Sequence, residues 1–349
     1  MRFRILFALI TCFFALNAGA QTAAESSPHD DTTAELATIV VSGEQPGPGL
    51  WKVSANDHVL WILGTLSPLP KGMAWRSKEV EDTIAQSQVV LNPPRLNVSA
   101  DVGFFGKLRL LPTLVGVRDN PDHKTLSQMM PADLYARWIA LKDKYIGVGR
   151  GRNVETWRPI FAALELYDAA IKKTGLTRSD ITGDIVRDAA KRAGVPLETP
   201  SIKLDVENPR EAVNKFKDAS MDDLDCFRRT LDRIDSDVIN MAARANAWAT
   251  ADIEALRKLP DSDLRSACFA AVTNTELARE RGIADIDVRL QKAWLDAASA
   301  ALAKNASSFA RLPIDDLLAP DGYLAKLRAK GYAIESPDDA AADSAQTPP

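Results

Sequence analysis

The segment from residue 50 to residue 92 constrains the fold most, because its periodicity changes from strand to helix and back to strand. Residues 50–65 alternate in polarity around an Ala-Asn-Asp turn and predict a β-hairpin. Residues 77–87 then predict a helix, and residues 88–92 a buried strand. Strand, helix and strand in this order are typical of a parallel pair with a crossover connection.

The rest of the chain is dominated by helical spacing until strands return near the C-terminus. The predicted elements are helices at 131–145, 156–174 and 181–193, a strand at 195–198, only helices from 209 to 304, a strand at 308–312, a helix at 323–329 and a strand at 332–335. The predicted fold class is therefore α/β (α+β). Its central mixed or parallel sheet is built from the N- and C-terminal segments, with a large helical insertion between them.

The N-terminus carries the features of an export signal. Two arginines precede an apolar run at 5–16, which is too short to span a bilayer, and Ala-Gly-Ala follows. We therefore predict a signal peptide at 1–20, cleaved between Ala20 and Gln21, and a periplasmic or secreted protein of the bacterial envelope. The alternatives are a buried N-terminal helix and a lipid anchor at Cys12.

The composition sets the limits of the folded domain. Residues 21–48 are polar and predict a disordered linker, and the Ala-, Asp- and Pro-rich residues 337–349 predict a disordered tail, which leaves 49–336 as the domain. The formal net charge is −4 and there is no basic block, which argues against a nucleic-acid partner. After the leader, no segment approaches the roughly 18 apolar residues of a transmembrane helix.

Two cysteines remain after removal of the predicted leader. Cys226 and Cys268 both lie in segments that predict helices. In an oxidising compartment they are disulfide candidates that would link two helices. Two buried free thiols would give the same sequence pattern, so the pairing stays open here.

Motifs at both ends of the domain resemble those of the TraB/GumN (TraB/PrgY/GumN) family. That family opens with a Leu-Trp-x-Val hairpin, a Gly-x-x-His motif and a Trp-Arg-Ser-like helix start, and it continues with Trp-x-x-Gly-Asp, Pro-Asp-Gly and Leu-Arg-x-x-Gly-Tyr. The corresponding segments here are residues 50–53, 64–67, 75–77, 248–252, 320–322 and 327–332. The resemblance extends over roughly 49–335 and is specific at its ends rather than in the helical middle.

The resemblance implies an EreA/ChaN-like architecture and the chemistry of a metal-dependent hydrolase or protease. In the family this chemistry is thought to use two Gly-x-x-His histidines, a glutamate after the first helix and the arginine of an Arg-Asn pair. Two imidazoles and a carboxylate can hold a divalent metal and leave a position open for water, or act as acid and base.

The sequence departs from the family pattern at most of these positions. Ser67 replaces the first histidine, and Asn92 replaces the glutamate. The second motif falls on residues 313–316, where Asp316 replaces the histidine, and the Arg-Asn pair is Arg281 followed by glycine. One carboxylate and two neutral oxygen ligands make a poor site for a divalent metal, so we expect no cofactor.

The remaining chemistry-bearing residues offer no evident substitute. The three histidines, His29, His58 and His123, are not spaced as metal ligands, and we interpret them as surface or turn residues. There is no nucleophile elbow, P-loop, Cys-x-x-Cys or dinucleotide-binding motif. Ser67 as a nucleophile would need a nearby base, and no histidine is an evident candidate.

Three functions are compatible with these observations. The leading hypothesis is a catalytically degenerate domain that binds a peptide, a protein or a small ligand near Ser67, Asn92, Arg281 and Asp316. The alternative is a hydrolase with a remodelled, metal-free or Asp-based site, in which Arg281 and Asp316 converge with Ser67 in an open pocket. The third is a structural role with a partner in the cell envelope.

Overall fold

The computed structural model describes five parts of the chain, residues 44–100, residue 106, and residues 109–147, 154–258 and 264–339. The predicted leader at 1–20, its cleavage position between Ala20 and Gln21, and most of the predicted linker lie outside the described residues. Among the helices of the described parts, none is long and apolar enough to cross a membrane.

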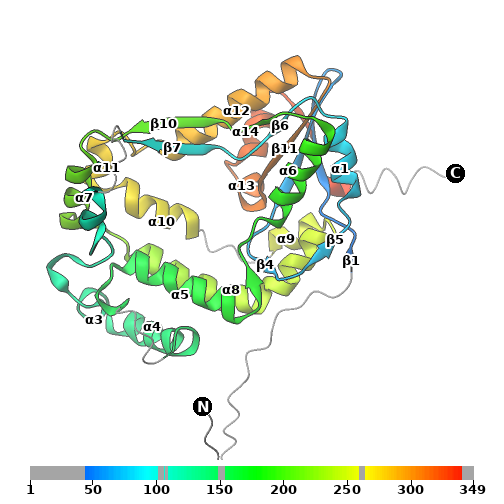
Figure 1. Cartoon of the computed structure of the whole chain (residues 1–349). Helices are drawn as coiled ribbons and strands as arrows, with labels where there is room; N and C mark the ends of the chain where they lie inside the picture. The colour runs from blue at the N-terminus through cyan, green and yellow to red at the C-terminus, as the bar shows by residue number, and fades with distance from the viewer. Residues whose placement is uncertain (1–43, 101–105, 107–108, 148–153, 259–263, 340–349) are drawn as a thin grey trace, which may run out of the picture. The chain divides into compact units, whose positions relative to one another are not determined.

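The central sheet has six strands drawn from both ends of the domain, in agreement with the predicted fold class (Figure 1). Four neighbouring strands of the sheet are parallel to one another, and the first of them also pairs with an antiparallel strand. A sixth strand pairs antiparallel with that strand at the edge of the sheet. In spatial order the strands are β12 (Ala333–Glu335), β2 (Leu50–Ala55), β3 (His58–Thr65), β11 (Ser307–Pro313), β6 (Val90–Leu91) and β9 (Leu197–Glu198).

The expected pairing of the first two parallel strands is wrong in one respect. β3 and β6 are parallel and joined through α1 (Lys78–Ala85), but β11 lies between them. Phe309 of β11 is in register with Trp61 on one side and with Val90 on the other. Phe309 is fully buried, so the C-terminal strand takes the most enclosed position of the sheet.

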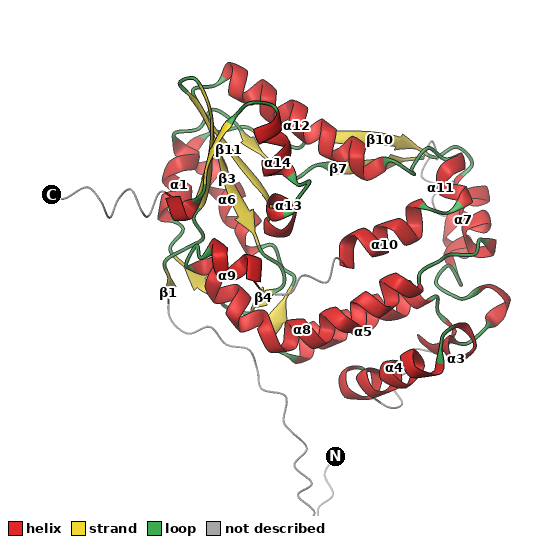
Figure 2. Ribbon diagram, turned by 180° about the vertical axis from the view of Figure 1, so that it is seen from behind, coloured by secondary structure: helices red, strands yellow, loops and turns green. Residues whose placement is uncertain are grey.

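Helices cover both faces of the sheet. α1 packs against α6 (Ile181–Ala193) on one face. On the other face lie α12 (Ile286–Lys304), α13 (Ile314–Leu318) and α14 (Tyr323–Ala329), as Figures 1 and 2 show from opposite sides. The buried residues of this sheet layer form one hydrophobic cluster, the main core of the fold.

The helical insertion has a hydrophobic core of its own. Trp138 packs beside Phe227 in this second cluster, with ring centroids 5.4 Å apart. Helix α8 (Leu224–Ala249) belongs to both cores, because Phe227 lies in the second cluster and Trp248 in the first. The helices of the insertion are α3 (Leu126–Met129), α4 (Ala132–Tyr145), α5 (Pro159–Lys173), α7 (Pro209–Asp218), α8 (Leu224–Ala249), α9 (Ile253–Lys258), α10 (Leu264–Thr273) and α11 (Glu276–Glu280).

Several short strands are not among the predicted elements. β7 (Arg95–Ser99) and β10 (Ser201–Asp205) form a parallel pair that continues β6 and β9 beyond the sheet. β4 (Leu69–Pro70) pairs with β8 (Leu176–Thr177), and β1 (Glu44–Gln45) pairs with β5 (Ala74–Trp75). The last residues of the predicted linker are therefore ordered against the domain. The short 3-10 helices are η1 (Leu111–Leu114), η2 (Pro121–His123) and η3 (Val154–Thr156).

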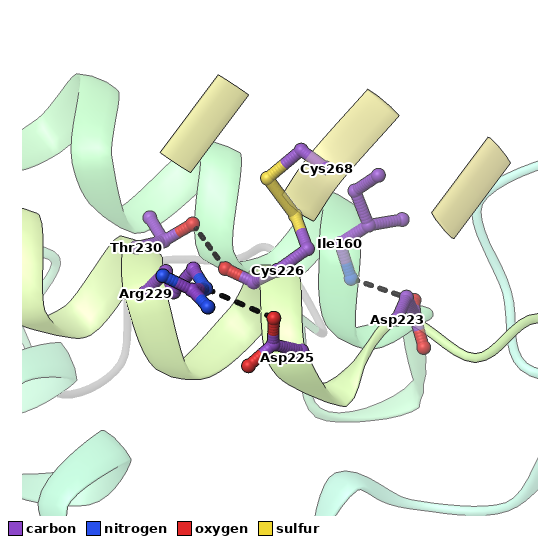
Figure 3. The surroundings of a disulfide bond; sticks show 7 residues. All are labelled: Ile160, Asp223, Asp225, Cys226, Arg229, Thr230 and Cys268. Carbon is purple, nitrogen blue, oxygen red and sulfur yellow. Dashed lines mark hydrogen bonds and ion pairs between the residues drawn. A yellow bond between two sulfur atoms is a disulfide. The ribbon is translucent and has the colours of Figure 1, made fainter. Parts of the chain in front are cut away.

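A disulfide between Cys226 and Cys268 joins α8 to α10 (Figure 3). Both cysteines lie in a small hydrophobic cluster with Ile160 of α5. Asp223, immediately before α8, accepts a hydrogen bond from the Ile160 backbone N–H at 2.8 Å. Of the two interpretations left open by the sequence, the structure has the helix-to-helix bridge.

Candidate functional site

Two motif glycines allow α13 to pack closely where the central strands end. A Cβ on Gly64 of β3 would collide with the Ile314 side chain, and a Cβ on Gly322 would collide with the Asp316 carbonyl oxygen. The indole Nε1 of Trp248 also donates a hydrogen bond to the Gly64 carbonyl oxygen at 2.7 Å. The two glycines thus allow the close approach of α13 to β3, and Trp248 ties α8 to the same strand.

A cleft of about 770 Å³ lies at the carboxyl ends of β3, β6, β9 and β11. Ligands of open α/β sheets bind in this position because the loops that follow the strands converge there. The cleft is lined by residues 65–67 after β3, residues 92–96 after β6 and residues 178–183 around the start of α6, together with Arg187, Leu197, Thr199, Arg311 and Pro313. Ser67 and Asn92, two of the predicted site residues, therefore meet in one cleft.

Arg311 organises the floor of this cleft. Its Nε donates to Asn92 Oδ1 at 3.0 Å, and its Nη1 donates to Asp180 Oδ2 at 2.6 Å. Asn92 Nδ2 in turn donates to Thr199 Oγ1 at 3.2 Å. The Arg311 side chain is only 17% exposed, whereas that of Asp180 is 54% exposed. The network therefore holds one well-enclosed guanidinium against a carboxylate at the rim.

Asp180 also caps the N-terminus of α6. Its Oδ1 accepts hydrogen bonds from the Gly183 N–H at 2.8 Å and from Thr182 Oγ1 at 3.1 Å. Partial burial alone would raise the pKa of Asp180, but the hydrogen bond and charge of Arg311, helped by Gly183 and Thr182, hold that pKa below its ordinary value. Asp180 is therefore an ionised structural anchor rather than a poised base.

Gly183 has no Cβ, and its position leaves space for the ion pair between Asp180 and Arg311. A Cβ at Gly183 would lie 2.6 Å from Arg311 Nη1 and closer still to the Asp180 carboxylate. Any other residue there would displace the ion pair, because side chains do not tolerate such contacts. The glycine thus belongs to the geometry of the cleft.

Three further arginines line the cleft at its open side. Arg178 pairs with Asp168 at 2.7 Å and is 53% exposed, and Arg187 pairs with Asp184 at 2.5 Å and is 61% exposed. Arg95, the first residue of β7, is exposed as well. The charged side chains of the lining are thus four arginines and Asp180.

The structure does not bring all four predicted site residues together. Arg281, at the end of α11, donates from Nη1 to the Glu207 carbonyl oxygen at 3.0 Å, and it is not among the described residues that line the cleft. Asp316 lies on α13 and is also outside that lining. The convergence of Arg281 and Asp316 with Ser67 in one pocket, expected for a remodelled hydrolase site, is therefore not seen.

The residues at the cleft do not fit the divalent metal that the family resemblance implies. Within the described parts of the chain, no group of three or more His, Cys, Asp or Glu side chains is placed to hold an ion. Among the described residues that line the cleft, Asp180 is the one carboxylate, and it is engaged by Arg311. His58 contacts the Leu302 carbonyl oxygen through Nδ1 at 2.6 Å, and neither it nor His123 lines the cleft.

Arg311 and Asp180 were not among the residues that sequence reasoning selected. Asp180 precedes a predicted helix, so its ordinary interpretation is an N-cap, which it also is. The sequence does contain a signal for Arg311, because a charged arginine inside a largely apolar predicted strand needs a partner that compensates its charge. The partner itself lies 131 residues away in the chain, beyond the reach of local patterns.

The comparisons with known proteins address the family directly. The model of the TraB/PrgY/gumN family matches residues 49–336, which is most of the chain. No curated protein and no solved structure matches, so the EreA/ChaN-like architecture stays a prediction. The chain belongs to the TraB/PrgY/gumN family.

Proposed function

We propose that this chain is a catalytically degenerate member of its family that acts by binding a peptide, a protein or a small ligand in the cleft at the carboxyl ends of β3, β6, β9 and β11. The observation that carries the proposal is the composition of the cleft. Ser67 and Asn92 stand there at positions where the family has histidine and glutamate, and the one carboxylate of the lining is tied to Arg311. A large open cleft without an acid–base pair favours binding over turnover.

The alternative of a hydrolase with an Asp-based site receives less support. Ser67 would need a general base within hydrogen-bond reach. Asp180 shares the cleft, but its carboxylate is already engaged by Arg311, Thr182 and Gly183. Asp316, the other candidate carboxylate, is outside the lining.

A hydrolase screen with elemental analysis tests the absence of catalysis. The purified chain is expected to show neither peptidase nor esterase turnover and no stoichiometric metal. Metal-dependent turnover that is abolished by Asp316→Ala would overturn the proposal, as would one equivalent of bound metal. The same screen decides the metal-free alternative, because turnover that persists in a chelator would favour it.

A screen for ligands by thermal shift tests binding in the cleft. Thr199 lies exposed in the lining, so Thr199→Trp is expected to fill the cleft and abolish the shifts produced by its ligands. Val288→Trp is the matched control, since Val288 is 63% exposed on α12 and outside the lining. Ligands that stabilise both variants equally would place the binding surface elsewhere.

We also propose that the protein acts outside the cytoplasm, with a partner in the envelope as a further possibility for its ligand. The Cys226–Cys268 bridge supports this location, because disulfides persist in oxidising compartments. Cell fractionation with mass measurement is the test, and the expected product is an envelope protein that begins at Gln21. A cytoplasmic product that retains residues 1–20 would contradict it.

A further inference from the structure

The charge of the cleft is opposite to that of the chain as a whole. The full sequence carries a formal charge of −4, whereas four arginines and a single aspartate line the cleft. A concave surface with an excess of one sign of charge concentrates ions of the other sign. At the position of the family glutamate, Asn92 adds no negative charge that would offset the arginines.

Two of these arginines can change partners at little cost. Arg178 and Arg187 pair with Asp168 and Asp184, both outside the lining, and more than half of each arginine side chain is exposed. The Arg178 guanidinium also lies over the Tyr167 ring, 5.7 Å from its centroid. Exposed ion pairs contribute little net stability, because water solvates both groups. A ligand anion can therefore replace the aspartate partner of either guanidinium at little cost in stability.

The floor of the cleft keeps its geometry when the rim rearranges. Arg311 is 17% exposed and is held by Asn92 and Asp180 together. Ser67, two residues after β3, lies in the same lining, and a serine hydroxyl can act as a neutral donor. An enclosed ion pair on the floor with exposed arginines beside it suits a planar or tetrahedral oxyanion, since guanidinium groups bind both in bidentate fashion.

We infer that the cleft binds an anionic group, a carboxylate or a phosphate, with Arg178 and Arg187 as its ligands at the rim and Arg95 beside them. This inference rests on the proposed function, which places a ligand in the cleft, and it specifies the chemistry of that ligand. A volume of about 770 Å³ exceeds one oxyanion, so the anionic group is one end of a larger molecule.

Titration of the full chain with sodium phosphate and with sodium acetate tests this inference. Isothermal titration calorimetry and thermal shift are measured against sodium chloride of equal ionic strength, so that screening alone produces no difference. We expect saturable binding of at least one anion. A preference for phosphate or for acetate identifies which of the two oxyanions the ligand carries.

The variant Arg178→Gln/Arg187→Gln is expected to weaken the binding about tenfold or more, because each lost charge-assisted hydrogen bond weakens binding markedly. Arg228→Gln is the matched control. Arg187 pairs with Asp184 three positions away on α6, and Arg228 pairs with Asp225 at the same spacing on α8, with 61% and 51% of the arginine side chains exposed. Arg187→Lys keeps the charge but loses the planar fork, so intermediate affinity is expected.

The outcomes separate this inference from the proposed function. No saturable effect of either anion, or equal affinity in the double variant and the wild type, overturns the anion site whatever the hydrolase screen finds. Saturable, arginine-dependent binding in a chain that also hydrolyses substrates overturns the non-catalytic role and keeps the anion site.

Discussion

Arg311 Nη1 lies 2.6 Å from Asp180 Oδ2, and this contact ties the central strand of the sheet to the N-terminus of α6. The strand and the helix are 131 residues apart in the chain. The guanidinium is well enclosed while the carboxylate is half exposed. One ion pair thus joins a strand and a helix that are far apart in the sequence, and both of its residues line the cleft.

Loss of this pair is expected to reduce stability moderately. Arg311→Met keeps most of the buried stem but leaves Asp180 without its partner, so the free energy of unfolding should fall by about 1–2 kcal/mol. The exposure of Asp180 screens the pair and keeps the effect below that of a fully buried one. Urea unfolding of Arg311→Met, Asp180→Asn and the double variant gives the coupling energy, and additive effects would contradict the interaction.

The same pair predicts a dependence of stability on pH. Arg311 and the capping hydrogen bonds outweigh partial burial and lower the pKa of Asp180. A carboxyl group with a lowered pKa in the folded state stabilises that state above the unfolded pKa of about 3.9 and stops doing so as pH falls through the folded value. The stability difference between wild type and Asp180→Asn should therefore be constant from pH 7 to about 5 and shrink below that. A difference that grows towards low pH would show the opposite shift.

A third prediction concerns the close approach of α13 to β3. Gly64→Ala would place a Cβ against the Ile314 side chain, and such overpacking typically costs about 1–3 kcal/mol. Ile314→Val removes the atom that a Cβ at Gly64 would meet first, the Ile314 Cδ1 methyl. The Gly64→Ala/Ile314→Val variant should therefore be more stable than Gly64→Ala alone. Chemical denaturation of the three variants measures this, and equal losses in both backgrounds would contradict the packing argument.

The elements with strong local signals were predictable from the sequence. The hairpin around residues 55–58 carries its own alternation and turn residues, and α6 begins after Asp180 and ends at Gly194 with left-handed backbone. The insertion of β11 between β3 and β6 was not predictable in the same way. Strand order depends on contacts between segments more than 200 residues apart, and periodicity contains no information about them.

The candidate site likewise contains residues that were predictable from the sequence and residues that were not. Ser67 and Asn92 could be predicted from family motif positions, because Ser67 closely follows the predicted hairpin and Asn92 ends the next predicted strand. Arg281 was selected from a motif inside the helical middle, where spacing alone does not fix the helix arrangement, and it contacts Glu207 instead of the cleft. The arginines that line the cleft were not predictable in this way, because Arg178 before α6 and Arg187 on α6 have the sequence pattern of solvated surface residues.

A fourth prediction uses the strained backbone at Ala251. This residue has φ +58°, in the left-handed region, and it stands at the glycine position of the family's Trp-x-x-Gly-Asp motif. A Cβ makes this conformation about 1–2 kcal/mol less favourable, so Ala251→Gly should stabilise the protein by up to about 1 kcal/mol after the entropic cost of glycine. The control is Ala300→Gly at an exposed position of α12, where the same change should destabilise by about 1 kcal/mol. Melting temperatures should therefore move in opposite directions.

The disulfide supports the last prediction. Cys226 and Cys268 enclose a loop of 42 residues, and in the chain-entropy account a loop of that size stabilises the folded state by roughly 3–4 kcal/mol. Cys226→Ala/Cys268→Ala should lower the free energy of unfolding by about that amount, minus whatever strain the bridge imposes. Each single variant leaves one free thiol, detectable by alkylation, and should lose as much stability as the double variant.

Wild-type protein from an oxidising compartment should show no alkylation at either position before reduction, and a reductant should lower its melting temperature to that of the double variant. Equal melting temperatures with and without reductant would mean that the bridge contributes nothing to the stability of α8 against α10.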